Sequence, residues 1–336
     1  MRSEDLIQAG NLTAVMRKLR PEALSNLRHL PVGLTASGFE ASGAILATDA
    51  ANQRFFVATA KHNLLLAGGA AGTKKKVPKI GGNSQSADFR ADSRKIIDYC
   101  KSDMKVVYFT AATTGADVTL ATSGGGANAA EGTVTDVWFP EGAITADTWA
   151  YDACLLIVSY TTAPFATGRD WARRTTWVGP TKTTLEGYHG PGGGLRSQGT
   201  DAWQDCLVQL GFGRRDHSPM SKGNGRRQEK LSRFKARNAH VPIDVINVQN
   251  DDTVRNDDVF LLESTTDWTT LPGDSGGPLY VVNPSLKIPV QIGVTLGADG
   301  SATKNATYDL ATDGTYNNTV TSLLRLYTAL ETSPPA

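Results

Sequence analysis

The chain has 336 residues, of which 40% are hydrophobic and 20% are charged. This composition is that of an ordinary globular protein and excludes a wholly disordered chain. The 34 Lys and Arg residues nearly balance the 33 Asp and Glu residues, so the net charge of +1 argues against a uniformly basic nucleic-acid-binding protein. At about 150 residues per domain, the length predicts two domains or one large one.

Three cysteines, Cys100, Cys154 and Cys206, are too few for a disulfide framework and fit a reducing compartment. The first 20 residues hold no apolar stretch of the kind that forms a secretory signal. The longest nearly apolar run, residues 64–72, is much shorter than the roughly 18 residues that cross a membrane. The sequence therefore predicts a cytoplasmic protein without membrane contact.

A helical arm is expected over residues 1–31. Ser3 is a suitable N-cap, and the apolar residues between positions 12 and 19 recur at the spacing of one helical face. Pro21 ends this first helix, and residues 21–30 can hold a second short one. We interpret the arm as a packing element, with a docking or regulatory element as the alternative.

From Val32 onward the sequence changes to short Val-, Thr- and Gly-rich runs between turn signals, a pattern typical of an antiparallel sandwich or barrel. A first series of strands is expected at residues 42–48, 54–59, 106–109, 118–120, 132–138 and 153–158, with a turn at residues 49–52. A second series is expected at residues 206–210, 259–262, 278–282, 291–296 and 307–310. The chain closes with an expected helix and tail over residues 319–336, because five apolar residues share one helical face: Val320, Leu323, Leu324, Tyr327 and Leu330.

Gly-rich segments between the strands are expected to be surface loops. Three of them span residues 68–82, 124–132 and 187–199. A fourth, residues 211–238, is distinct because it carries nine Lys or Arg residues against two acidic ones, a net charge of +7.

The strongest local signal is the run Gly273-Asp-Ser-Gly-Gly-Pro. A serine between glycines can lie on a tight turn with its hydroxyl exposed, and Gly273 can adopt backbone angles that other residues avoid. The N–H groups of Gly273 and Ser275 could then point at one spot, as an oxyanion hole requires. Such a serine is inert until a base removes its proton.

This run resembles the nucleophile motif of chymotrypsin-like (trypsin-fold) serine proteases. The segment Phe56-Val-Ala-Thr-Ala-Lys-His-Asn resembles the family's histidine motif, and of the five histidines only His62 follows an expected strand in this way. The segment Tyr151-Asp-Ala-Cys-Leu-Leu-Ile-Val resembles the strand that carries the family's aspartate. The resemblance implies a catalytic triad of Ser275, His62 and Asp152, although Asp136 and Asp147 compete for the third place.

Two weaker matches extend the resemblance over about residues 32–318. The run Cys206-Leu-Val-Gln-Leu-Gly-Phe-Gly is similar to the strand that opens the family's second barrel, and Gly293-Val-Thr-Leu-Gly resembles the strand that lines its substrate channel. The family's cysteines are replaced by Asn63 and Leu271, so the chain is closer to the HtrA-like and glutamyl-endopeptidase-like members. Asp274 stands where those members usually have Asn, which leaves open whether activation is needed.

The resemblance implies an all-β fold of two six-stranded antiparallel Greek-key barrels, over residues 32–180 and 181–318. It also implies a serine endopeptidase, a hydrolase that forms an acyl-enzyme on Ser275 without metal or cofactor. Its oxyanion hole would be formed by the N–H groups of Gly273 and Ser275. Its substrate would be a protein or peptide, and limited cleavage of partner proteins is expected.

By the family register, Thr269, Thr270, Thr295 and Gly297 would form the substrate pocket. No carboxylate lies at its floor, so a strong preference for Arg or Lys is not expected, although Asp267 is only two residues off register. The pocket is therefore expected to be neutral and mildly polar.

The basic segment, residues 211–238, admits three interpretations. The first is a solvated loop, the second a nicking or activation site, and the third a site for an acidic partner, RNA or DNA. Nucleic acid is disfavoured, because Phe234 is the segment's one aromatic residue after Phe212 and base stacking would be poorly supplied. A non-catalytic binding protein on the same fold, and a hydrolase acting on esters other than peptides, are the rival functions.

Overall fold

The structure is a computed structural model. It describes residues 21, 26, 27, 29–36, 39–64, 93–110, 129–142, 151–164, 207–212, 243–244, 247–250, 259–264, 273–281, 289–298 and 316–335. The expected helix over residues 3–20, the expected strands at 118–120 and 307–310, the loops at 68–82 and 187–199, and most of the basic segment lie outside these residues. None of the described helices is long and apolar enough to cross a membrane.

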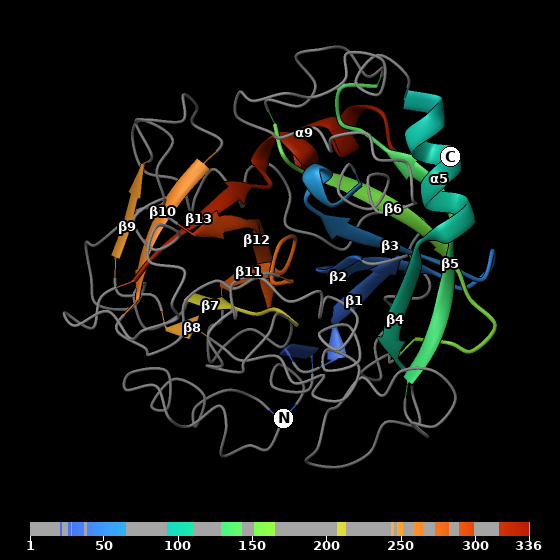
Figure 1. Cartoon of the computed structure of the whole chain (residues 1–336), viewed down its shortest axis with the longest axis horizontal. Helices are drawn as coiled ribbons and strands as arrows, with labels where there is room; N and C mark the ends of the chain where they lie inside the picture. Colours follow the sequence, from blue (N-terminus) through green and yellow to red (C-terminus); the bar gives the residue numbers. More distant parts are fainter. Residues whose placement is uncertain are drawn as a thin grey trace, which may run out of the picture.

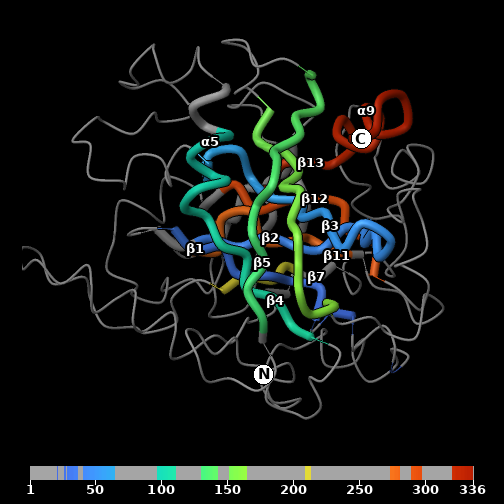
Figure 2. Tube along the Cα trace, turned by 90° about the vertical axis from the view of Figure 1, so that its right-hand side faces the viewer, coloured from blue at the N-terminus to red at the C-terminus, as the bar shows by residue number. Residues whose placement is uncertain are grey.

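The first half of the chain forms a closed barrel of six antiparallel strands. Its strands follow the order β1-β2-β3-β6-β5-β4, so β1 and β4 pair to close the circle. Figure 1 shows the barrel in blue to green, and in Figure 2 β5 runs down its near wall with α5 beside it. The strands are β1 (Pro31–Ala36), β2 (Phe39–Asp49), β3 (Arg54–Thr59), β4 (Lys105–Phe109), β5 (Ala129–Trp138) and β6 (Cys154–Ser159).

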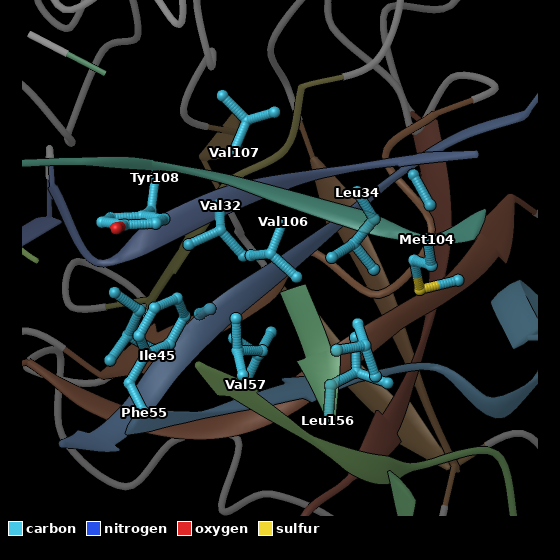
Figure 3. Close-up of a cluster of buried hydrophobic side chains, with 14 of the residues drawn as sticks. Val32, Leu34, Ile45, Phe55, Val57, Met104, Val106, Val107, Tyr108 and Leu156 are labelled. Atoms are coloured by element: carbon cyan, nitrogen blue, oxygen red, sulfur yellow. The ribbon is translucent and has the colours of Figure 1, made fainter. Parts of the chain in front are cut away.

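Alternating side chains fill the interior of this barrel. Val32, Val57, Val106 and Leu156 come from four different strands, and their side chains point toward one another (Figure 3). On β5, residues 131–134 alternate between exposed and buried, until a bulge after Val134 shifts the register against β6. The strands expected at residues 42–48, 54–59, 106–109, 132–138 and 153–158 are thereby confirmed to within a residue or a short extension.

The turn expected at residues 49–52 is also confirmed, and it joins β2 to β3. Asp49 holds it, because its carboxylate accepts hydrogen bonds from the backbone and side chain of Asn52 and from Arg54 Nε at 2.9 Å. Gln53 takes a positive φ of 49° in this turn. These hydrogen bonds hold the pKa of Asp49 below its ordinary value, although burial acts in the opposite direction.

The second half forms a seven-stranded sheet, drawn mainly in orange and red in Figure 1. The described strands do not form the second six-stranded barrel that the sequence led us to expect. Their order is β8-β7-β11-β12-β13-β10-β9, and every pairing is antiparallel. The strands are β7 (Leu207–Gln209), β8 (Ile243–Asp244), β9 (Asn247–Asn250), β10 (Val259–Ser264), β11 (Pro278–Val281), β12 (Val290–Ala298) and β13 (Tyr316–Ser322).

In the described part of the chain, two helices pack against the sheets. α5 (Ser93–Asp103) was not expected, although Ile97, Cys100 and Met104 recur at helical spacing and pack against the barrel core. α9 (Leu324–Thr332) is the expected closing helix, but its expected start at residue 319 was wrong. Val320 lies in β13 instead, where it pairs with Phe260 and Thr295, because sheet pairing outweighs its place on a helical face.

Two further expectations concern residues next to the barrel. Residues 129–132, expected to be part of a surface loop, form the start of β5 and pair with β4. Of the expected arm, Leu27 and Leu30 lie in the barrel core, and Leu30 N donates to Asn26 O in a helical turn.

A second apolar core joins the two halves. The outer faces of β2, β3 and β6 contribute Leu46, Ala58 and Leu155, and the second sheet contributes residues such as Ile292 and Val294. Leu326, Tyr327 and Leu330 of α9 complete this core. Because α9 packs in one core with residues of both halves, it bridges the barrel and the sheet.

The close approach of β5 and β6 at Gly132 gives a test of the barrel. A Cβ on this residue would lie 2.5 Å from Val158 Cγ1 and 3.1 Å from Ser159 O. We expect Gly132→Ala to lower the free energy of unfolding by about 1–3 kcal/mol, the usual cost of overpacking. Urea denaturation would measure it, with the exposed neighbour Glu131→Ala as control and an expected change within about 0.5 kcal/mol. Equal losses in the two variants would contradict the barrel packing.

Candidate active site

His62 and Asp152 come together because their strands pair. Thr59, the last residue of β3, pairs with Cys154, the first residue of β6. The strands are antiparallel, so the helical turn that follows β3, residues 61–64, lies beside the segment that precedes β6. His62 lies in that turn and Asp152 in that segment. Residues 90 positions apart in the chain therefore meet at one end of the barrel.

Asp152 holds His62 at two points. Its Oδ1 accepts a hydrogen bond from the backbone N–H of His62 at 2.8 Å, and its Oδ2 lies 2.6 Å from His62 Nδ1. The aspartate side chain is only 4% exposed and the histidine side chain 13%. Because a carboxylate accepts hydrogen bonds, this contact favours the tautomer with the proton on Nδ1 and leaves Nε2 as an acceptor.

Ser275 lies on a tight turn that begins β11. Gly273 and Gly276 take positive φ values of 99° and 79°, which side chains with a Cβ rarely adopt. Gly277 N donates to Asp274 O at 2.8 Å, and the turn is joined to β12 by two hydrogen bonds of 2.7 Å between Thr295 and residues 276 and 277.

The glycines after the serine also allow the turn to touch the barrel. A Cβ on Gly276 would overlap Thr59 Oγ1 and Ser42 O and would lie 2.5 Å from Asn63 Nδ2. A Cβ on Gly277 would overlap Leu210 O. The Gly-Gly pair in the motif is therefore required by two close backbone approaches, one to the barrel and one to the end of β7.

Ser42 and Asn63 fasten the turn to the barrel. Ser42 N and Asn63 Nδ2 both donate to Ser275 O, at 2.9 and 3.0 Å. Ser42 Oγ donates to Gly273 O at 2.7 Å and accepts from Phe212 N at 2.8 Å. Ser42 and Asn63 are completely buried. The residue next to His62 in the chain thus binds the carbonyl of Ser275.

The structure therefore brings the three expected triad residues to the junction of barrel and sheet, but it does not link them all directly. Within the described part of the chain, no hydrogen bond joins the Ser275 hydroxyl to the His62 ring. Of the competing carboxylates, Asp136 lies in β5 and binds the N–H of its neighbour Val137, whereas Asp147 lies outside the described residues.

The residue before His62, Lys61, forms a buried ion pair with Glu141. Lys61 has a completely buried side chain, and its Nζ lies 2.8 Å from both carboxylate oxygens of Glu141. The rings of Tyr151 and Phe139 flank the ammonium group at 5.2 and 5.8 Å. Burial lowers the pKa of Lys61, and the nearby charge of Glu141 partly offsets this effect. Sequence reasoning missed both residues, because Lys61 has no assigned role within the segment that carries His62, and Glu141 belongs to no motif.

The expected substrate pocket is only partly described. Thr269 and Thr270 lie outside the described residues. Thr295 and Gly297 lie on β12, on either side of a register shift against β13. The Thr295 side chain is completely buried and accepts a hydrogen bond from Gln209 Nε2 at 2.7 Å, which makes it part of the sheet core.

The described cysteines are not placed for chemistry. Cys100 and Cys154 are free and buried, and burial raises the pKa of Cys100 to about 12 and that of Cys154 well above its ordinary value. A thiol with a raised pKa is a poor nucleophile. Within the described residues, no group of three or more His, Cys, Asp or Glu side chains could hold a metal ion.

Comparison of the chain with models of known protein families and with curated proteins found no match.

The Lys61–Glu141 pair leads to a prediction about stability and pH. Glu141→Gln leaves the Lys61 charge buried without its carboxylate, and we expect the free energy of unfolding at pH 7 to fall by about 3 kcal/mol. The pKa of Lys61 would fall further below the unfolded value of about 10.4. Between these two pKa values the unfolded chain binds more protons, so stability rises with pH and the deficit should shrink toward pH 10.

Urea denaturation of wild type and variant at pH 7 and pH 9.5 would measure this effect. The double variant Lys61→Met, Glu141→Gln removes both charges and should lose less stability than Glu141→Gln alone. A single variant as stable as wild type at pH 7 would show that the ion pair does not form.

Proposed function

We propose that the protein is a serine endopeptidase of the chymotrypsin-like type, in which Ser275, His62 and Asp152 form the catalytic triad. In this proposal the seven-stranded sheet takes the place of the second barrel. The single observation that carries the proposal is the hold of Asp152 on both the backbone and the ring of His62. The Ser275 turn is fastened beside that histidine by Asn63.

The fixed ring orientation supports His62 as the general base. With Nδ1–H bound to Asp152, Nε2 is free to take the Ser275 proton as the hydroxyl attacks a carbonyl carbon. The carboxylate then stabilises the imidazolium that forms. His62 returns the proton to the leaving amine, and an acyl-enzyme remains on Ser275. Water then attacks the acyl carbon while His62 takes its proton. His62 gives this proton to Ser275 Oγ as the bond to the acyl group breaks and the acid product leaves.

The turn supports the oxyanion hole that the motif implies. Asp274 O accepts from Gly277 N, and in a trans peptide the N–H and C=O groups point in opposite directions. The Ser275 N–H of the same peptide is therefore directed away from Gly277 N. The Gly273 N–H is the second proposed donor, and the hydrogen bond from Ser42 to Gly273 O helps to fix this residue. One such donor contributes roughly 3–4 kcal/mol to the transition state.

The proposed substrates are proteins or peptides, cleaved at a limited number of sites. The buried Thr295 hydroxyl is already bound to Gln209, so it does not supply a charge or a free hydroxyl for substrate selection. A neutral pocket remains the proposal for this side of the site.

Labelling with a fluorophosphonate tests the proposal directly, because this reagent reacts with activated serines. We expect one adduct per chain on the wild type by intact-protein mass spectrometry, and none on Ser275→Ala or His62→Ala. Ser159→Ala removes a serine of β6 and should be labelled like the wild type. An adduct that survives in Ser275→Ala would place the reactive group elsewhere.

Asp152→Asn tests the role of the aspartate. An amide can donate to Nδ1 and thereby favour the wrong histidine tautomer, so we expect the rate of labelling or peptide cleavage to fall by about 10⁴-fold with the fold intact. Peptide-library profiling of the wild type would provide the substrate for this measurement. A loss of less than tenfold would remove Asp152 from the triad.

A further inference from the structure

We propose that Tyr151, held by the first turn of α9 and by Arg325 of that helix, is a positioning residue for Asp152. The inference rests on the proposed function, because it assigns Tyr151 a role in the reaction of that site. Tyr151 directly precedes Asp152 in the chain, is completely buried, and is used by none of the steps described above.

The Tyr151 hydroxyl makes two hydrogen bonds to the segment that forms the start of α9. It donates to Ser322 O at 2.8 Å and accepts from Leu326 N at 3.1 Å. Both contacts are buried, and they span more than 170 residues of sequence. A buried carbonyl and a buried N–H would each be left without this partner if the hydroxyl were removed.

This contact is a helix cap supplied by a distant residue. The first N–H groups of a helix have no partner within the helix, and a side chain at the N-cap usually accepts one of them. In α9 the N-cap is Leu323, which has no such side chain. The Tyr151 hydroxyl takes over that function at Leu326, so the start of α9 and the position of Tyr151 depend on each other.

Two cationic side chains contact the ring of the same tyrosine. The Arg325 guanidinium and Lys61 Nζ each lie 5.2 Å from the centroid of the Tyr151 ring. Arg325 Nη2 also lies 3.6 Å from Glu141, the partner of Lys61. The ring thus contacts both a cation of α9 and the residue that precedes His62.

The consequence concerns the distance between Asp152 and His62. Asp152 lies on a short segment before β6, and its grip on the histidine needs both carboxylate oxygens in place. Anchoring the adjacent residue to α9 restricts that segment on the side away from β6. Productive geometry in such sites is lost with displacements of about 1 Å. α9 belongs to the core that joins the barrel and the sheet, so it provides a rigid support.

The test compares Tyr151→Phe with Tyr327→Phe. The first variant keeps the ring and removes the two hydroxyl contacts. The second removes a hydroxyl from the same core, where Tyr327 of α9 donates to the backbone of Gln291 in β12 at 3.2 Å and not to the start of α9. Two signals are measured on each folded variant: the rate of fluorophosphonate labelling, and the Nδ1 proton resonance of His62 by NMR with ¹⁵N-labelled histidine.

We expect Tyr151→Phe to slow labelling by about 10- to 100-fold and to broaden or abolish the His62 Nδ1 proton resonance through faster exchange with water. Tyr327→Phe should keep the resonance and label within twofold of the wild type. Unchanged resonance and labelling in Tyr151→Phe, or equal losses in both variants, would overturn the proposal.

A second variant applies if Tyr151→Phe does not fold. Arg325 is 46% exposed, so Arg325→Gln should leave the fold intact while it removes the cation from the Tyr151 ring. We expect a two- to fivefold slower labelling and a broadened His62 resonance, and no change in either would overturn the proposal.

The NMR signal keeps this result separate from the proposed function. If the wild type reacts with no fluorophosphonate, the proposed function fails, yet the resonance still reports whether Tyr151 holds the Asp152–His62 pair. If the wild type reacts and the resonance does not depend on Tyr151 or Arg325, the positioning role alone fails.

Discussion

The pairing of β3 with β6 is the constraint on which the candidate site depends. It fixes the end of one strand beside the start of another, and the histidine and the aspartate lie just beyond those two points. The short distance from Asp152 to His62 then follows from the sheet register with little further adjustment. A one-residue slip would turn every side chain of β3 to the opposite face, so the apolar interior of the barrel also protects the geometry of the polar pair.

The Ser275 turn of the second half is attached to the barrel near this pair through its backbone carbonyl groups. Ser42 and Asn63 hold the Ser275 turn by its carbonyls, and the glycines of that turn permit an approach that no other residue allows. Ser42 and Asn63 are completely buried, so their hydrogen bonds to the turn satisfy polar groups that water does not reach. The junction is therefore specific in position although no disulfide joins the two halves among the described cysteines.

Sequence reasoning went furthest where a local pattern and a chemical motif coincide. The barrel strands followed from alternation and turn residues, and the segments around His62, Asp152 and Ser275 could be recognised because each resembles a motif of a known family. At Ser275 the pattern has a physical reason, since close contacts exclude a Cβ at Gly276 and Gly277. It failed where distant contacts decide. Val320 fits a helix and a strand equally well, and its pairing partners select the strand.

The support behind the site could not have been predicted for the same reason. Nothing local marks Glu141 as the partner of Lys61 or Tyr151 as the cap of α9, because both contacts exist only after the barrel and the sheet have assembled. α5 is a different case. Its apolar spacing was present in the sequence, but its charged residues obscure a short helical face.

The core shared by the outer wall of the barrel, the second sheet and α9 has a consequence for modularity. Each half buries an apolar face that would be exposed if the other half were removed, so neither half is a self-contained unit that could be excised or exchanged. A chimaera that replaces the barrel would also have to retain the residues of this shared core, including α9. The two halves depend on each other for the burial of this core, and the residues of the proposed triad lie where they meet.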